Sequence, residues 1–153
     1  MTDFIKVGAK APSFTLKDQD GNRVSLSDFK GKKVLLSWHP LAWTSVCMDQ
    51  MRSIERNYDR FTAANTVVLG LSVDPQPSKS AWAKVICLKQ LKILTDFHPL
   101  GQTSNDYGIF NEKNGISGRA NVLIDEEGTV IWAKNYDIPE LPDIEEVLKQ
   151  VEG

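Results

Sequence analysis

Cys47 stands where two regular elements meet, and its position suits nucleophilic chemistry. The apolar segment 34–38 is typical of a buried strand, and apolar spacing over 48–61 predicts a helix directly after the cysteine. At a helix N-terminus the thiolate is favoured, because free backbone N–H groups and the helix dipole stabilise negative charge. A thiolate attacks peroxides, disulfides and other electrophiles. The alternative is a buried, unreactive cysteine of the kind that protein cores contain.

The composition is typical of a soluble globular protein. The 153 residues are 41% hydrophobic and 25% charged, with a formal net charge of -2 and no run of like charges, which argues against a nucleic-acid-binding surface. No apolar stretch is long enough for a membrane span, and the first residues lack the layout of a signal peptide. We therefore expect a cytoplasmic protein. Cys47 and Cys87 are too far apart for a Cys-x-x-Cys motif, which leaves them as a candidate redox pair.

Hydrophobic periodicity predicts alternating strands and helices around Cys47. A strand at 33–38, a helix at 48–61 and a buried strand at 66–73 call for a right-handed parallel crossover. The other predicted elements are a hairpin over 12–28, a turn at 28–30 capped by Ser27, a helix from Ser78 to Ile86, a strand at 91–94, a short helix at 103–107, a hairpin over 120–134 and a helix from 144 to 151. This order predicts one α/β domain over 1–153 with a thioredoxin-like fold: a central mixed β-sheet flanked by helices, with an N-terminal β-hairpin.

The spacing Pro40-x-x-x-Thr44-x-x-Cys47 resembles the PxxxTxxC signature of peroxiredoxins. Further segments resemble the same family over about residues 8 to 151: 11–14, 70–74, 82–83, 95–101 and 115–119 running into 122–125. Within the family, the chain is most similar to the small one-cysteine AhpE-type group, with the bacterioferritin-comigratory type as its neighbour. A C-terminal extension with a resolving cysteine is absent from the sequence given, which argues against the two-cysteine intersubunit arrangement.

The resemblance implies roles for four residues. Cys47 is the peroxidatic nucleophile, and the Thr44 hydroxyl holds the peroxide in line, although helix capping is an alternative or additional role. Pro40 shapes the pocket wall and shields the thiolate from water, or simply ends a strand. Arg119 stabilises the thiolate and the charge that develops on the breaking O–O bond; its alternative is a solvated strand end.

His39, Trp43, Gln50 and Trp82 are expected to border the same pocket. Gln50 replaces an acidic residue that is frequent in the family, and an amide cannot anchor an arginine by charge. The two tryptophans either pack in the core or line an apolar entrance for organic peroxides. A hydrolase-type cysteine–histidine pair with His39 or His98 is an alternative, but no Asn or Asp is evident to orient either ring.

Cys87 is ambiguous. A resolving cysteine can occur in this helix in the bacterioferritin-comigratory type, but nearer Trp82, whereas AhpE-type members tend to have glycine at about this position. Neighbouring Val85, Ile86 and Leu88 predict apolar burial, which slows a thiol's attack. We expect a buried or incidental thiol, with resolution of Cys47 as the alternative.

The predicted function is that of a thiol-dependent peroxidase. It would reduce hydrogen peroxide, alkyl hydroperoxides or peroxynitrite through a Cys47 sulfenic acid, with a thioredoxin, glutaredoxin or mycoredoxin-type reductant and no metal, haem or flavin. The alternatives are a redox sensor and a thiol–disulfide oxidoreductase, but the latter needs a cysteine where Gln50 stands. Leu41, Ala42 and Trp43 give the active-site loop apolar residues, from which we expect a homodimer.

Overall fold

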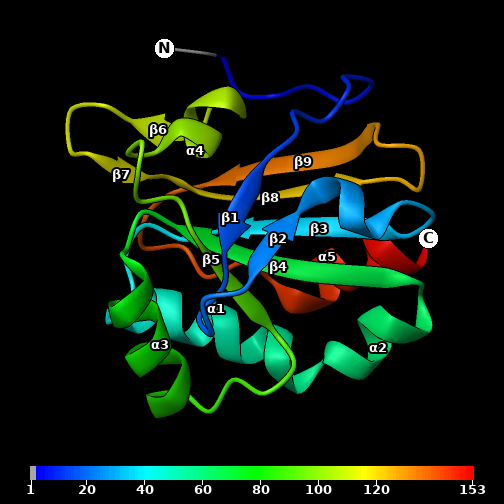
Figure 1. Ribbon diagram of the computed structural model, residues 1–153. Helices are drawn as coiled ribbons and strands as arrows, with labels where there is room; N and C mark the ends of the chain where they lie inside the picture. Colours follow the sequence, from blue (N-terminus) through cyan, green and yellow to red (C-terminus); the bar gives the residue numbers. More distant parts are fainter. Residues whose placement is uncertain (1–2) are drawn as a thin grey trace.

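The computed structural model describes residues 3–153, and a seven-stranded sheet with the order β2-β1-β5-β4-β3-β8-β9 forms its centre (Figure 1). The strands are β1 (Thr15–Lys17), β2 (Arg23–Ser25), β3 (Lys33–Trp38), β4 (Thr66–Ser72), β5 (Lys92–Thr95), β8 (Arg119–Ile124) and β9 (Val130–Tyr136), with β6 (Phe110–Asn111) and β7 (Ile116–Ser117) as a separate pair. The helices are η1 (Leu26–Phe29), α1 (Ser45–Arg56), α2 (Tyr58–Ala63), α3 (Gln76–Val85), α4 (Gln102–Asp106) and α5 (Ile144–Glu152). The predicted mixed sheet and N-terminal hairpin are confirmed.

Strand β3 has one parallel and one antiparallel neighbour, and this arrangement determines which residues lie near its C-terminal end. It pairs in parallel with β4, through the crossover of α1 and α2, and antiparallel with β8. In the second pairing Trp38, the last residue of β3, faces Ala120 near the start of β8. The residue before Ala120 is Arg119, so the register brings this arginine to the end of β3 from which the chain enters α1.

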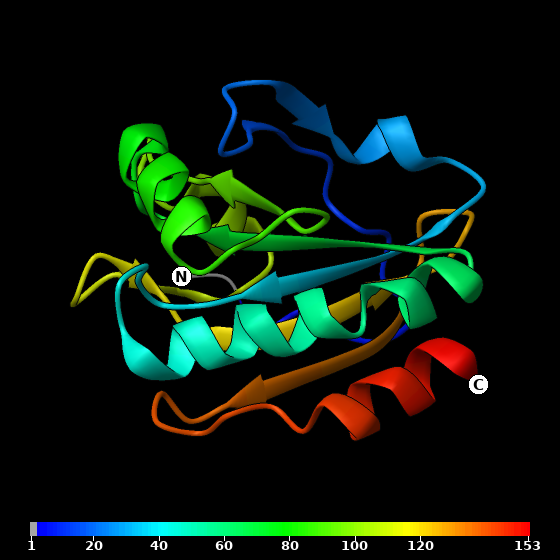
Figure 2. The same ribbon diagram turned by 90° about the horizontal axis from the view of Figure 1, so that it is seen from below.

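Alternate residues of the strands face two separate apolar layers. Leu35 and Val68 point into one layer, which contains the buried faces of α1, α2, α3 and α5. Leu36 and Leu69 point into the other, which is covered by the N-terminal segment, the β1–β2 hairpin and the turn after α4. Figure 2 shows α1, α2 and α5 together on the first face. Both faces of β3 and β4 are therefore covered, as their apolar runs predict.

The helix predicted over 48–61 starts earlier and is divided in two. It begins at Ser45 and ends at Arg56, and α2 follows after Asn57. The Asn57 side chain donates to the carbonyl oxygen of Ser53, a contact with the preceding turn that competes with continuation of the helix. Apolar spacing alone does not reveal this break, because Phe61 remains on the buried side.

Two predicted caps are wrong. Helix α3 begins at Gln76 with Pro75 as its N-cap and Pro77 in the first turn, where a proline needs no N–H partner, so Ser78 lies inside the helix. The turn at η1 is capped by Ser25 instead of Ser27. Within residues 3–153, no helix is long and apolar enough to cross a membrane.

Candidate active site

Cys47 is the third residue of α1 and is almost fully buried, with 1% of its surface exposed. The chain reaches it from the end of β3 through the loop 39–44, as the cyan ribbon in Figure 2 shows. The first three N–H groups of a helix have no partner within the helix, and Cys47 lies among them. The predicted position at a helix N-terminus is therefore confirmed, and water has little access to the sulfur.

Arg119 supplies a positive charge to this sulfur. Its Nη1 atom lies 3.4 Å from the Sγ atom of Cys47 and donates to the Oε1 atom of Gln50 at 2.7 Å. Its Nε and Nη2 atoms donate to the carbonyl oxygen of Ile138 at 3.0 and 2.7 Å. The guanidinium is 2% exposed, so these contacts hold it in one orientation. The structure places this arginine inside the site and not at a solvated strand end.

Gln50 fixes the arginine without neutralising it. It lies one turn after Cys47, and its Nε2 atom donates to the Ser37 hydroxyl at 2.8 Å and to the Trp38 carbonyl at 3.1 Å. These bonds turn its Oε1 atom toward Arg119. Within residues 3–153, the hydrogen-bond partners of this guanidinium are a sulfur, an amide oxygen and a carbonyl oxygen, so no carboxylate competes with a Cys47 thiolate for its charge.

Thr44 and Pro40 occupy the loop in front of Cys47. Thr44 has the backbone conformation of an N-cap residue, but its hydroxyl donates to the Leu41 carbonyl at 2.8 Å and does not cap the helix. The side chain is exposed, so its oxygen lone pairs remain accessible to a molecule that approaches Cys47. Pro40 is buried at the start of the same loop.

The other three residues expected to border the pocket differ in their burial. His39 and Trp82 are buried with 0% and 1% exposure, and their rings pack at a centroid distance of 5.4 Å. Neither lines an entrance, because both are core residues beneath the loop. Trp43 is 53% exposed with a positive φ of 71°, and its Nε1 atom donates to the Ser78 hydroxyl on α3. Of these four, Gln50 is the one for which the described residues show a hydrogen bond to the Cys47–Arg119 pair.

Lys79 is the buried charge that sequence reasoning missed. It is fully buried, and its Nζ atom lies 3.2 Å from the Nε2 atom of His39. Burial lowers the pKa of Lys79 to about 7 and holds that of His39 well below its usual value. A signal was present, because Lys79 precedes Trp82 by three residues and so shares the buried face of α3.

Cys87 does not have the predicted environment. It is exposed, and it follows α3 with a φ of +60°, a left-handed conformation in which its N–H donates to the Lys84 carbonyl. The chain turns here, so the side chain leaves the apolar face that Ile86 continues. The expectation of apolar burial, which Val85 and Leu88 suggested, is wrong; Val85 is itself exposed.

Comparison with known proteins agrees with this geometry. The AhpC/TSA family matches residues 7–133. Alkyl hydroperoxide reductase E of Mycobacterium tuberculosis is 35% identical over 140 residues, which are 91% of each chain. Peroxiredoxin 2 of Picrophilus torridus is 32% identical over 97% of this chain and 75% of its own length. The chain belongs to the AhpC/TSA family of peroxiredoxins.

The structure of this peroxiredoxin is similar to solved ones in the same family. The reduced 2-Cys peroxiredoxin of Plasmodium vivax superposes with a TM-score of 0.89 and 30% identity, over 95% of this chain and 80% of that one. The thioredoxin-like fold and the assignment as a thiol-dependent peroxidase are confirmed by these relatives.

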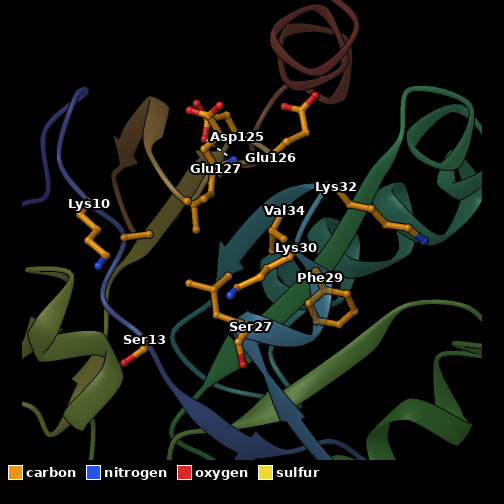
Figure 3. A pocket seen from close by; sticks show the side chains of 14 residues that line it. Lys10, Ser13, Ser27, Phe29, Lys30, Lys32, Val34, Asp125, Glu126 and Glu127 are labelled. Atoms are coloured by element: carbon orange, nitrogen blue, oxygen red, sulfur yellow. Dashed lines mark hydrogen bonds between the residues drawn. The ribbon is translucent and has the colours of Figure 1, made fainter.

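The structure also has an apolar hollow of about 290 Å³, and Figure 3 shows the side chains that line it. It is lined by the N-terminal segment, η1, the start of β3 and the turn between β8 and β9, and Lys10, Lys30 and Glu126 are among its residues. Cys47 follows the opposite end of β3, a strand about 20 Å long at 3.3 Å per residue. The hollow therefore does not belong to the peroxide site.

Proposed function

We propose that Cys47 reduces hydroperoxides, including hydrogen peroxide, alkyl hydroperoxides and peroxynitrite. The thiolate attacks one peroxide oxygen, an S–O bond forms and the O–O bond breaks. The other oxygen leaves as hydroxide or as the corresponding anion and is protonated, and the sulfur is oxidised by two electrons to a sulfenic acid. The distance of 3.4 Å between the Arg119 guanidinium and the Cys47 sulfur carries this proposal, since it puts a fixed donor where charge develops.

Thr44 and Pro40 have supporting roles in this proposal. The exposed Thr44 hydroxyl orients the peroxide through its oxygen lone pairs, because its own hydrogen is donated to the Leu41 carbonyl oxygen. Pro40 has no N–H and is buried, so it closes the loop without bringing a competing donor to the sulfur. We further infer that residues 1–153 act as one domain in the cytoplasm; residues 1–2 lie outside the described residues.

An external thiol completes the cycle in this proposal. A reductant of the thioredoxin, glutaredoxin or mycoredoxin type attacks the sulfenic acid, releases water and leaves a mixed disulfide, which a second thiol reduces. Cys47 is buried and Cys87 exposed, so a bond between them requires a helix end near one of them to unfold. We therefore place resolution by Cys87 second.

The test is peroxide consumption by two matched serine variants. Cys47→Ser should abolish consumption in the presence of a thiol reductant, and Cys87→Ser should leave the first oxidation step unchanged. The intact mass after one equivalent of peroxide should rise by one oxygen. A loss of two hydrogens in the wild type, absent from Cys87→Ser, would assign resolution to Cys87. Equal consumption by Cys47→Ser and the wild type would refute the proposal.

The loop beside the site also supports a homodimer. Leu41, Trp43 and Met48 are exposed around Cys47, although Ala42 is buried. Pairing of two copies through this loop would remove the apolar side chains from water. Sedimentation should show a dimer that Trp43→Glu weakens, with Val85→Glu as the control, because Val85 is exposed on α3. A species of 17.1 kDa at all concentrations would contradict the expectation.

A further inference from the structure

Lys79 is a charge in a place where a charge is unfavourable. The side chain extends from α3 into the core beneath the active-site loop and has no exposed surface. The effective penalty for burying an ammonium group is several kcal/mol unless polar groups compensate it. A leucine or methionine would fill the same space without that penalty. The polar groups around Lys79 therefore indicate its role.

His39 is the direct partner of Lys79. The 3.2 Å between their nitrogens is a hydrogen-bond distance, and two positive charges at this separation repel strongly. The ring is fully buried, and both Lys79 and Arg119 oppose its protonation, so His39 is neutral. A neutral ring accepts at Nε2 from the ammonium. His39 directly precedes Pro40, so this bond fixes the beginning of the loop that leads to Cys47.

Asp74 contacts the middle of the same loop and acts on Lys79 through its charge. One of its carboxylate oxygens accepts from the backbone N–H of Ala42 at 2.8 Å and from the Ser72 hydroxyl at 2.5 Å. The negative charge of Asp74 favours the ammonium form of Lys79, as do those of Cys47 and Asp96. The charged groups that act on the pair come from four elements or their ends: Asp74 after β4, Asp96 after β5, Cys47 on α1 and Arg119 on β8.

We propose that Lys79 is a positioning residue for the Cys47 reaction. Its buried ammonium holds the loop 39–44 through its contact with His39 and its attraction to Asp74, and it adds a second positive charge near the thiolate. This inference rests on the proposed function, because it concerns the rate at which Cys47 reacts with peroxide. Arg119 lies directly against the sulfur, with its Nη1 atom 3.4 Å from Sγ. Lys79 does not touch the sulfur, and its proton can leave.

The consequence is a rate of Cys47 oxidation that falls when Lys79 loses its proton. Burial brings the pKa of Lys79 to about 7, so the ammonium is lost as the pH rises through the neutral range. The rate should decrease several-fold on the alkaline side as the second charge disappears. A lysine with only a structural role would give a rate without this decrease.

The experiment measures the rate of Cys47 oxidation by hydrogen peroxide from about pH 6 to about pH 9. The wild type should show the decrease on the alkaline side. Lys79→Met should lack it and react roughly tenfold more slowly near pH 6, where the wild-type lysine is charged. Lys84→Met is the matched control, because Lys84 is exposed on the same helix, and its profile should equal that of the wild type.

Three outcomes would overturn the inference. One is a wild-type pH–rate profile without an alkaline decrease, an outcome that can be observed without making any variant. The second is a Lys79→Met profile with the same decrease, which would assign the titration to another group. The third is a Lys79→Met rate equal to the wild type near pH 6. These three outcomes are distinguishable from failure of the proposed peroxidase function. That function would be refuted if the Cys47→Ser variant consumed peroxide as the wild type does.

Discussion

Replacement of Arg119 by methionine tests the central contact of the site. Methionine is apolar and flexible enough to fill much of the same space, so the change removes the charge and the donors while limiting the cavity. The Cys47 sulfur then loses its cation, and the Gln50 amide oxygen loses its donor at 2.7 Å. The Ile138 carbonyl also loses two bonds, but Ile138 is 48% exposed and water can replace them.

The expected loss of activity follows from these contacts. Removal of one fixed donor to a developing oxyanion costs about 3 kcal/mol, on the order of a hundredfold in rate. The thiolate content at neutral pH should fall as well, because an opposite charge near the sulfur is removed. Stability should fall by about 1–3 kcal/mol, the penalty for one unpaired buried acceptor. The variant should therefore remain folded and react slowly.

The assay is the rate of Cys47 oxidation under single-turnover conditions, with thiolate absorbance measured in parallel. Arg119→Lys retains a charge but not the planar fork that contacts both Cys47 and Ile138, so its rate should lie between those of the wild type and Arg119→Met. Arg56→Met, at an exposed position on α1, is the control and should not change the rate. An Arg119→Met rate within twofold of the wild type would refute the reasoning.

Three further predictions concern neighbouring features. Gln50→Met should lower the oxidation rate by roughly tenfold, less than Arg119→Met, because the arginine loses its orientation but keeps its charge; an unchanged rate would contradict this. Cys87→Gly should raise the free energy of unfolding in urea by about 1 kcal/mol, whereas Cys87→Val should lower it. The reason is that a φ of +60° suits glycine and strains a branched side chain. Equal urea midpoints for the wild type and both variants would show that no strain is present. The stability of the wild type relative to Lys79→Met should rise from pH 7 toward pH 10, by up to about 1.4 kcal/mol per pH unit. In this window the Lys79 side chain holds its proton in the unfolded chain but has lost it in the folded chain. Urea unfolding at several pH values measures this, and a difference in unfolding free energy that does not change with pH would contradict the prediction.

The fold was predictable because its strongest signals are local. Apolar runs and turn residues identify β3, β4 and the β8–β9 hairpin to within a few residues. The placement of Cys47 in the first turn of a helix follows from the same signals. Sequence periodicity cannot predict where a helix breaks or starts when the possible positions have the same hydrophobic pattern. The break at Asn57 and the start of α3 at Gln76 depend on single side-chain and backbone contacts.

The site was predictable only where a motif carried it. Cys47 and Arg119 come from the resemblance, and their contact could not be inferred from spacing because it depends on the register of β3 against β8. Lys79 was missed because a lysine in an amphipathic helix is ordinarily solvated, and its burial depends on groups from other elements, such as His39 and Asp74. Cys87 was misplaced because its apolar neighbours say nothing about a left-handed residue that turns the chain.

The antiparallel pairing of β3 with β8 also has a consequence for the protein during its synthesis. Cys47 and Arg119 are separated by 72 positions, and β8 follows five strands of the sheet in chain order. A growing polypeptide thus carries its cysteine through nearly half of the chain's synthesis before the guanidinium exists. Oxidation of an incomplete chain proceeds without the cation that assists it, so the thiol gains its full reactivity only when the last strands have docked. Sensitivity to peroxide is in this way a property of the finished molecule.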